Sequence, residues 1–216
     1  MAITLKKIAE EAGTSVATVS MVLRDYPVRC SAETAKKNKE IARKNNYVPN
    51  YAAVSLIKQK TDTIGVIVPD IENLFFAGLV KQWNRMFSKD GYTLILLSQS
   101  DGSAGAKLEQ IETLRRKNVD AMILALSLGE ESKERDRIAE EINRLDVPHV
   151  IVDAYSAQVR CGCIATDHSL GAELAADYLI ANGHRKIGCI TGGEKEYSAV
   201  RRYEGFLKSM KKHGVP

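Results

Sequence analysis

Three aspartates stand close behind apolar, strand-like runs of the sequence, where carboxylates could bind a polar ligand. Asp70, Asp101 and Asp153 each follow such a run within a few residues. Ligands of parallel sheets bind at the carboxyl ends of the strands, so we expect these side chains along one edge of a sheet. Carboxylates and nearby serines suit a hydroxyl-rich or otherwise polar small molecule. The simpler alternative is that they only cap the helices that follow.

Other reactive residue types do not assemble into a catalytic or metal-binding set. The histidines are scattered, and none stands beside a serine or cysteine at a recognisable spacing: His149, His168, His184 and His213. The cysteines match no standard zinc spacing, which favours reduced, structural thiols: Cys30, Cys161, Cys163 and Cys189. We therefore expect no enzyme, no metal and no cofactor, although the three aspartates leave a hydrolase formally open.

From Thr63 onward, strand-like and helical runs alternate. Strands are expected at 64–68, 93–97, 121–124, 150–152, 163–165 and 187–190. Helices are expected at 75–89, 107–117, 132–145, 170–181 and 200–212. This alternation predicts an α/β fold with a parallel sheet that helices cover on both faces.

The start of the chain predicts short helices instead. Leu5–Ala12 reads as one amphipathic helix, Gly13 permits a sharp turn, and Ser15 suits the cap of a second helix that runs to Leu23. Its inner face is expected to carry Val16, Val19 and Leu23. Two short helices joined by a tight glycine turn form the helix-turn-helix layout, whose second helix enters the major groove of DNA. Two packed surface helices of an ordinary bundle are the alternative.

A third helix is expected from Ser31 to about Asn45. Its inward positions should be Thr34, Ala35, Asn38, Ile41, Ala42 and Asn45. Asn38 is unusual there, since a buried amide without a partner costs about 1–3 kcal/mol.

The charge of the chain is concentrated near its start. Residues 1–60 hold 11 Lys and Arg against 5 Asp and Glu, whereas residues 61–216 hold 20 against 22. A small basic module beside a near-neutral body suggests a polyanionic partner, with a merely solvated basic surface as the alternative.

A short apolar helix is expected at residues 51–57, before a polar linker at 58–62. A helix of this length is marginal alone in water. It needs a second copy of itself or a surface against which to fold.

The composition is that of a globular protein, with 44% hydrophobic and 27% charged residues in 216. No apolar run approaches the roughly 20 residues that cross a bilayer, and the first residues do not form a charged-then-apolar leader. These features predict a cytoplasmic protein without a membrane partner.

The whole pattern resembles the LacI/GalR family of bacterial transcription regulators. The segments that carry the resemblance are Thr4-Leu5, Ile8-Ala9, 12–20, 47–50, Ser55-Leu56, 63–71, Asn73, Phe75-Phe76, Asp120, Asp153, Asp167, 183–187, Arg202 and Gly205-Phe206. The resemblance implies a helix-turn-helix domain at 1–49 and a hinge helix with its linker at 50–62. It further implies a periplasmic-binding-protein-like, doubly wound core with a first lobe at 63–167 and an incomplete second lobe at 168–216.

The resemblance also implies a function: a dimeric, nucleoid-associated repressor whose affinity for operator DNA responds to a sugar-like or nucleobase-like effector. A small-molecule receptor without DNA function is the alternative. DNA would be contacted by Thr4, Ser15, Val16, Ala17, Thr18, Ser20, Met21, Arg24, Thr34, Asn50, Ala53 and Leu56, with Leu56 as the minor-groove wedge. The effector would be contacted by Asp70, Phe75, Asp101, Asp153 and Arg202.

The chain departs from the family at positions that matter for these roles. Met21 stands where Arg is usual, Arg24 where Asn is usual, and His168 where Asn is usual. Without long polar side chains, Val16 and Ala17 offer only apolar contacts to bases, such as thymine methyl groups. The chain also stops one strand–helix unit into the second lobe, as a fragment or an early-ending reading frame would. One complete wall of the effector cleft is therefore expected.

Overall fold

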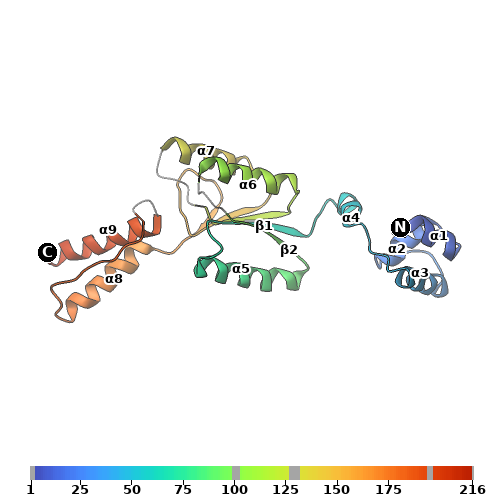
Figure 1. Ribbon diagram of the computed structural model, residues 1–216, viewed down its shortest axis with the longest axis horizontal. Helices are drawn as coiled ribbons and strands as arrows, with labels where there is room; N and C mark the ends of the chain where they lie inside the picture. The colour runs from blue at the N-terminus through green and yellow to red at the C-terminus, as the bar shows by residue number, and fades with distance from the viewer. Residues whose placement is uncertain (1–2, 99–102, 127–131, 194–196, 216) are drawn as a thin grey trace. The chain divides into compact units, whose positions relative to one another are not determined.

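The computed structural model describes residues 3–98, 103–126, 132–193 and 197–215. The chain forms two compact units, Met1–Ile57 and Lys58–Pro216. Figure 1 labels the helices and strands of both. The finer division into 1–49, 50–62, 63–167 and 168–216 stays a prediction.

The described part of the first unit contains four short helices. They are α1 (Leu5–Ala12), α2 (Val16–Leu23), α3 (Ala32–Lys44) and α4 (Tyr51–Lys58), whose last residue belongs to the second unit. A small core joins the first three helices, since Ile8 and Ala9 pack with Val19 and Ala42. Burial of this apolar surface stabilises a module whose helices are too short to persist alone.

The turn between α1 and α2 is fixed by its backbone. Gly13 ends α1 in the left-handed region at φ 72°, where glycine has no steric cost. The Gly13 amide donates to the Glu10 carbonyl and the Thr14 amide donates to the Ala9 carbonyl at 3.0 Å. Two orphan carbonyls of α1 are thereby satisfied before α2 begins.

The predictions for the inner faces of α2 and α3 are partly wrong. Val19 is buried in α2 as predicted, but Val22 is the second buried residue, while Val16 is exposed. In α3, Asn38 is fully buried as predicted and Asn45 is exposed. The neighbouring turn supplies one partner, since Thr14 Oγ1 donates to Asn38 Oδ1 at 3.4 Å.

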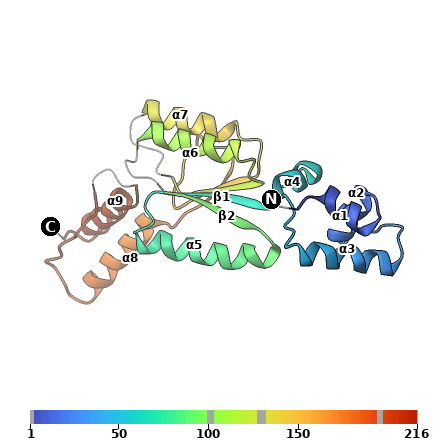
Figure 2. The same cartoon turned by 45° about the vertical axis from the view of Figure 1, so that its right-hand side comes forward.

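The second unit is built on a sheet of five parallel strands. They are β1 (Thr63–Val68), β2 (Thr93–Ser98), β3 (Ala121–Leu124), β4 (His149–Val152) and β5 (Gly162–Ile164), in the order β2-β1-β3-β4-β5. The connection from β2 to β3 crosses over β1, which leaves β2 at one edge of the sheet (Figure 2). Each of these strands was expected within one residue at either end.

Helices cover both faces of this sheet, as Figure 1 shows. On one face α5 (Leu74–Phe87) packs, followed by the 3-10 turn η1 (Ser88–Asp90). On the other face α6 (Ala104–Arg116) and α7 (Ser132–Asn143) pack, with Ile111, Leu114 and Ile138 wholly buried against the strands. The prediction of an α/β fold, with a helical N-terminal module and a doubly wound parallel sheet, is confirmed.

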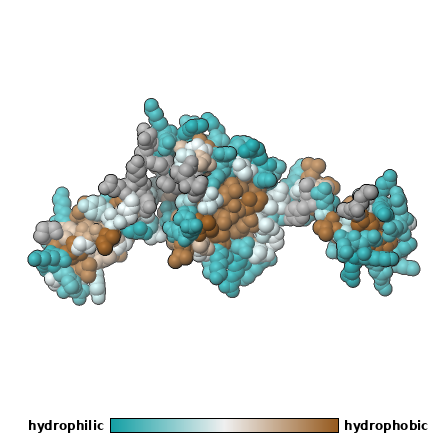
Figure 3. Space-filling view, viewed as in Figure 1, coloured by the Kyte–Doolittle hydropathy of each residue, from teal (hydrophilic) through white to brown (hydrophobic). Residues whose placement is uncertain are grey.

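The side chains of the edge strand β2 are only partly buried. Residues 94–97 are half-buried, whereas residues 64–68 of the adjacent β1 are buried. Figure 3 shows apolar residues gathered on the surface in the region where Figure 1 labels β1 and β2. An edge strand also presents unpaired backbone groups, and natural proteins usually cover such an edge.

The helices α8 (His168–Ala181) and α9 (Tyr197–Lys212) lie side by side and run in the same direction, since Ser169 lies against Gly205 and Asp177 against Lys212. Asp177 of α8 accepts hydrogen bonds from Ser209 and from Lys212 Nζ at 2.9 Å, and it contacts His213. These bonds lower the pKa of the Asp177 carboxyl to about 2.

The strand expected at 187–190 is wrong. Residues 184–193 are described, and they form neither strand nor helix. Ile187 packs beside Ile180 and Met210, but Ile190 is wholly exposed. A strand requires a hydrogen-bonding neighbour, and the described part of the chain places none beside this segment.

Among the described helices, none is long and apolar enough to span a membrane.

Gly205→Ala tests the packing of α8 on α9. A Cβ at Gly205 would lie 2.0 Å from the Ser169 carbonyl oxygen, so the helices must separate. We expect thermal unfolding followed by circular dichroism to show a loss of about 1–3 kcal/mol. Gly78→Ala in α5 is the matched control, because no atom lies within 4 Å of its added Cβ. Equal stability of the two variants would contradict this packing.

Candidate functional site

The outward face of α2 is apolar and carries no charge. Val16 and Met21 are each 44% exposed, and Ala17 between them is also exposed. Val19 and Val22 point into the core and hold this face outward. The side chains of Val16, Ala17 and Met21 can pack against apolar groups of a partner, but they cannot donate hydrogen bonds to its polar groups.

Hydroxyl groups lie at the N-termini of the first three helices. Thr4 Oγ1 accepts from the Lys7 amide at 3.3 Å, and Ser15 Oγ accepts from the Thr18 amide at 3.1 Å. Ser31 caps α3 in the same way, and its hydroxyl lies 2.8 Å from that of Thr34. Helix N-termini attract anions, because their free amides and their dipole both favour negative charge.

The predicted contact residues of these helices differ in exposure and position. Thr18, Ser20, Arg24 and Thr34 are half-buried, while Thr4 and Ser15 are exposed. Burial raises the pKa of the Tyr47 phenol, and the nearby charge of Arg24 opposes that rise. Arg24 therefore lies close to Tyr47, at the base of α2 rather than at its exposed start.

The helix α4 exposes the apolar side chains that define it. Leu56 is 82% exposed, Ile57 is also exposed, and Ala53 faces solvent as well. Asn50 precedes the helix, and its carbonyl accepts from the Val54 amide at 3.1 Å. The first unit thus carries two exposed apolar surfaces, one on α2 and one on α4.

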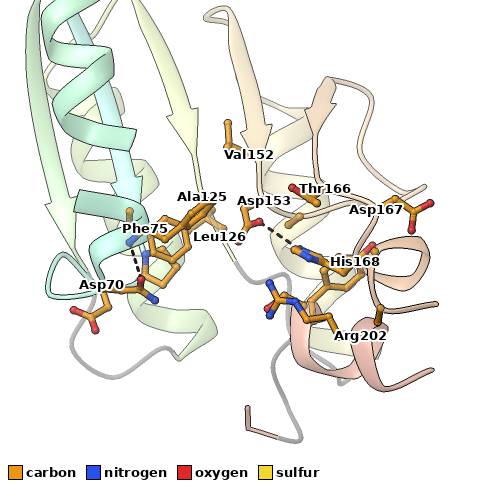
Figure 4. A pocket seen from close by; sticks show the side chains of 18 of the residues that line it. Asp70, Phe75, Ala125, Leu126, Val152, Asp153, Thr166, Asp167, His168 and Arg202 are labelled. Carbon is orange, nitrogen blue, oxygen red and sulfur yellow. Dashed lines mark hydrogen bonds and ion pairs between the residues drawn. The ribbon is translucent and has the colours of Figure 1, made fainter. Parts of the chain in front are cut away.

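The second unit holds a cavity of about 820 Å³ at the carboxyl ends of its strands. Figure 4 shows its walls, which come from the end of β1, the start of α5, the end of β4 and the starts of α8 and α9. The structure brings together four of the five residues expected there: Asp70, Phe75, Asp153 and Arg202. The fifth, Asp101, lies outside the described residues.

Several acidic and amide side chains of this cavity accept hydrogen bonds from nearby backbone amides. Asp70 Oδ1 accepts from the Glu72 amide at 2.8 Å, and Asn73 Oδ1 accepts from the Phe75 amide at 3.0 Å. Asp167 caps α8 through the Leu170 amide. The capping alternative does not hold for Asp70, because Asn73 caps α5 and Asp70 bonds only the turn before it.

Asp153 differs from the other carboxylates of the cavity. Its backbone has φ 60°, a region that few residues other than glycine adopt, and its amide donates to the Ile164 carbonyl at 2.8 Å. Its Oδ1 lies 3.5 Å from Nε2 of His168. The local backbone thus turns this side chain toward the start of α8, as Figure 4 shows.

Aromatic and cationic groups complete the wall. The rings of Phe75 and Phe76 meet edge-on at 5.1 Å, and Phe75 is half exposed to the cavity. Arg202 enters from α9, and Figure 4 shows it beside His168. An aromatic face with carboxylates and one guanidinium suits a polar ligand that has an apolar face.

Sequence reasoning did not assign His168, Thr166 or Tyr197 to the cavity, yet all three line it. A signal was present for His168, which closely follows the strand-like run that becomes β5. The rule that ligands bind at strand ends applies to it as to the aspartates. Among the described residues, no group of three or more His, Cys, Asp or Glu could hold a metal ion.

Comparison with known proteins gives this geometry a family. Residues 4–50 match the family described as "Bacterial regulatory proteins, lacI family". Residues 61–216 match "Periplasmic binding proteins and sugar binding domain of LacI family". The chain belongs to the LacI family. Its two units therefore correspond to the two parts that define LacI-family regulators.

Individual relatives agree with this assignment. The chain is 33% identical to the HTH-type transcriptional regulator RegA of Clostridium saccharobutylicum over 216 residues and 34% identical to the ribose operon repressor of Escherichia coli K12 over 213. It spans 63% and 62% of their lengths. A solved structure of the lac repressor dimer bound to operator covers the whole chain with a TM-score of 0.86 at 23% identity, which shows the shared fold.

Ser15→Ala tests the cap of α2. The variant loses the hydroxyl that accepts from the Thr18 amide, so amide exchange within α2 should quicken about fivefold, as a cap worth about 1 kcal/mol predicts. Ser20→Ala in the same helix is the control, because Ser20 is not at the cap. Hydrogen exchange followed by NMR makes the comparison, and equal rates in wild type and Ser15→Ala would refute the assigned cap.

Proposed function

We propose that the chain binds specific DNA sites as a homodimer and represses transcription, and that a small-molecule effector changes its affinity for the operator. The carrying observation is the module that matches at residues 4–50. There Gly13 turns the chain sharply, and the core residues of α2 leave Val16, Ala17 and Met21 exposed. This is the arrangement in which a recognition helix enters a major groove.

The reading itself rests on shape and apolar contact. Val16 and Ala17 can pack on thymine methyl groups, because neither side chain can hydrogen-bond to a base edge. The hydroxyls and free amides at the starts of α1, α2 and α3 suit phosphate oxygens and fix the register of the module. Thr18, Ser20, Met21, Arg24 and Thr34 belong to this proposed interface.

The helix α4 supplies the second contact. Its exposed Leu56 fits between base steps of a minor groove, and such apolar wedges bend the duplex. Asn50 directly precedes this short helix and Ala53 lies on it, and both would face the backbone of the groove. A second copy of α4 would cover the apolar residues that this copy leaves exposed, so the proposal requires a dimer.

The half-buried edge strand β2 is a further surface for that dimer. Its open side offers both backbone groups and the apolar side chains of residues 94–97. Pairing or packing there would bring two first units to one palindromic site. The protein would then act in the cytoplasm, on the nucleoid.

The cavity beside Asp153 and Arg202 is the proposed effector site. Its carboxylates, guanidinium and aromatic face suit a sugar or a nucleobase. Among the relatives, the ribose operon repressor of E. coli and the repressor PurR of Vibrio vulnificus are each 34% identical to the chain. The name of the ribose operon repressor supports a sugar-like ligand, and we propose no catalytic role.

A binding selection tests the proposal. The chain is mixed with a randomised duplex library, and the enriched sites are measured by fluorescence anisotropy over a range of salt. We expect palindromic sites and a steep loss of affinity with salt, because phosphate contacts release counterions. Equal affinity for all sequences at every salt would reject sequence-specific regulation and favour the receptor alternative.

Leu56→Ala tests the wedge. Alanine favours the helix more than leucine does, so this change removes the apolar tip without weakening α4. We expect its operator affinity to fall about tenfold or more, at least as far as that of Val16→Ala, since a mismatched or lost base contact costs about 1–3 kcal/mol.

Val48→Ala is the control for both variants, because Val48 is exposed and lies outside the helices of the first unit. Anisotropy with one enriched duplex compares all four proteins. Wild-type affinity in Leu56→Ala would show that α4 does not contact the minor groove.

A further inference from the structure

A buried histidine faces the cavity, and the proposed effector chemistry does not use it. His168 is only 8% exposed, and its side chain lies on the wall between Asp153 and Tyr197. Its Nε2 atom is buried and has no hydrogen-bond partner among the described residues. A buried polar atom without a partner carries a cost in free energy, so such an atom calls for an explanation.

The nearest acceptor is Asp153 Oδ1, at 3.5 Å. This distance fits an ion pair, but it exceeds a normal N–H···O hydrogen bond, which has a mode of about 2.9–3.0 Å. Closing it requires a movement of about half an ångström, within the reach of a small side-chain rotation. The two groups therefore stand one short step from a bond.

The backbone holds both residues where they are. The Asp153 amide donates to the Ile164 carbonyl, and the His168 amide donates to the Thr166 carbonyl at 2.9 Å. The imidazole also meets the ring of Tyr197 edge-on, with centroids 6.4 Å apart. Because the ring is packed and the strand end is fixed, the carboxylate of Asp153 is the group with freedom to turn.

We infer that His168 is a positioning residue for Asp153. When a ligand fills the cavity, Nε2 donates to Oδ1, and the second oxygen of Asp153 is thereby aimed at the ligand. This inference rests on the proposed function, in which Asp153 contacts the effector. It adds the group that sets the direction of that contact.

The orientation of the second Asp153 oxygen determines which ligand groups it can bind. An oxygen of Asp153 held in this way accepts from an O–H or N–H group and repels a carboxylate or phosphate at the same place. A sugar hydroxyl and the N–H edge of a nucleobase both supply such a donor. Binding measurements with D-ribose, 2-deoxy-D-ribose and hypoxanthine distinguish a sugar ligand from a nucleobase ligand.

The first arm needs no ligand. The chain is labelled with ¹⁵N in its imidazole rings, and the Nε2 resonance of His168 is compared with that of Asp153→Asn. Asp70→Asn is the matched control, because Asp70 lines the same cavity and has its own partner at the Glu72 amide. We expect Asp153→Asn to shift the resonance and Asp70→Asn to leave it in place. No shift in either variant would overturn the pairing of His168 with Asp153.

The second arm measures binding of each probe by chemical-shift titration of the cavity residues. His168→Leu removes the donor, and we expect its affinity for the bound probe to fall about tenfold, as the loss of a hydrogen bond to a charged group implies. His168→Gln keeps an N–H at similar reach and should restore binding to within about threefold. Matching thermal melts of the variants exclude unfolding as the cause.

The outcomes separate the two claims. Binding that is equally strong in wild type and His168→Leu overturns the positioning role while the effector site stands. Binding that is lost equally in the Leu and Gln variants makes His168 a packing residue and also overturns it. If none of the probes binds, the proposed effector site and the role of His168 fail together, while the Asp153→Asn arm still decides the contact.

Discussion

The left-handed turn at Gly13 is the constraint on which the proposed DNA-reading surface depends. It ends α1 with two carbonyls satisfied and starts α2 after only two further residues, with Ser15 as its cap. The core of Ile8, Val19 and Ala42 then fixes which side of α2 faces outward. Because the module is small, one backbone conformation sets the direction of the exposed face of α2, and with it of every proposed base contact.

A second constraint is the length of α4. Eight residues form too few helical hydrogen bonds to be stable in water, and the apolar side chains of α4 face solvent in a single chain. A groove and a second copy would supply the missing cover. In the proposed dimer, the order of α4 would respond to dimer geometry, which a ligand in the cavity of the second unit would alter. Coupling of this kind links two sites through a marginally stable element.

Local signals in the sequence were sufficient where structure is local. The caps at Ser15 and Ser31 and the parallel strands of the sheet follow from residue types and periodicity. The inner face of α2 was partly misjudged, because a stripe on eight residues leaves the rotation of the helix open until α1 and α3 pack on it. The strand at 187–190 failed because a strand depends on a distant neighbour. His168 was missed because its burial beside Asp153 depends on how the start of α8 packs at the end of β4, which no local pattern shows.

We propose that α2 reads DNA as a fixed helix and that α4, the hinge helix, becomes ordered only when the chain binds its target site. The most direct test is amide hydrogen exchange of Val16–Leu23 and Tyr51–Lys58, measured with an enriched palindromic duplex and with a scrambled duplex of equal length. The account predicts slow exchange in α2 with either duplex at low salt, and strong protection of α4 only with the palindromic one. Exchange in α4 that is equally fast in both complexes would contradict it.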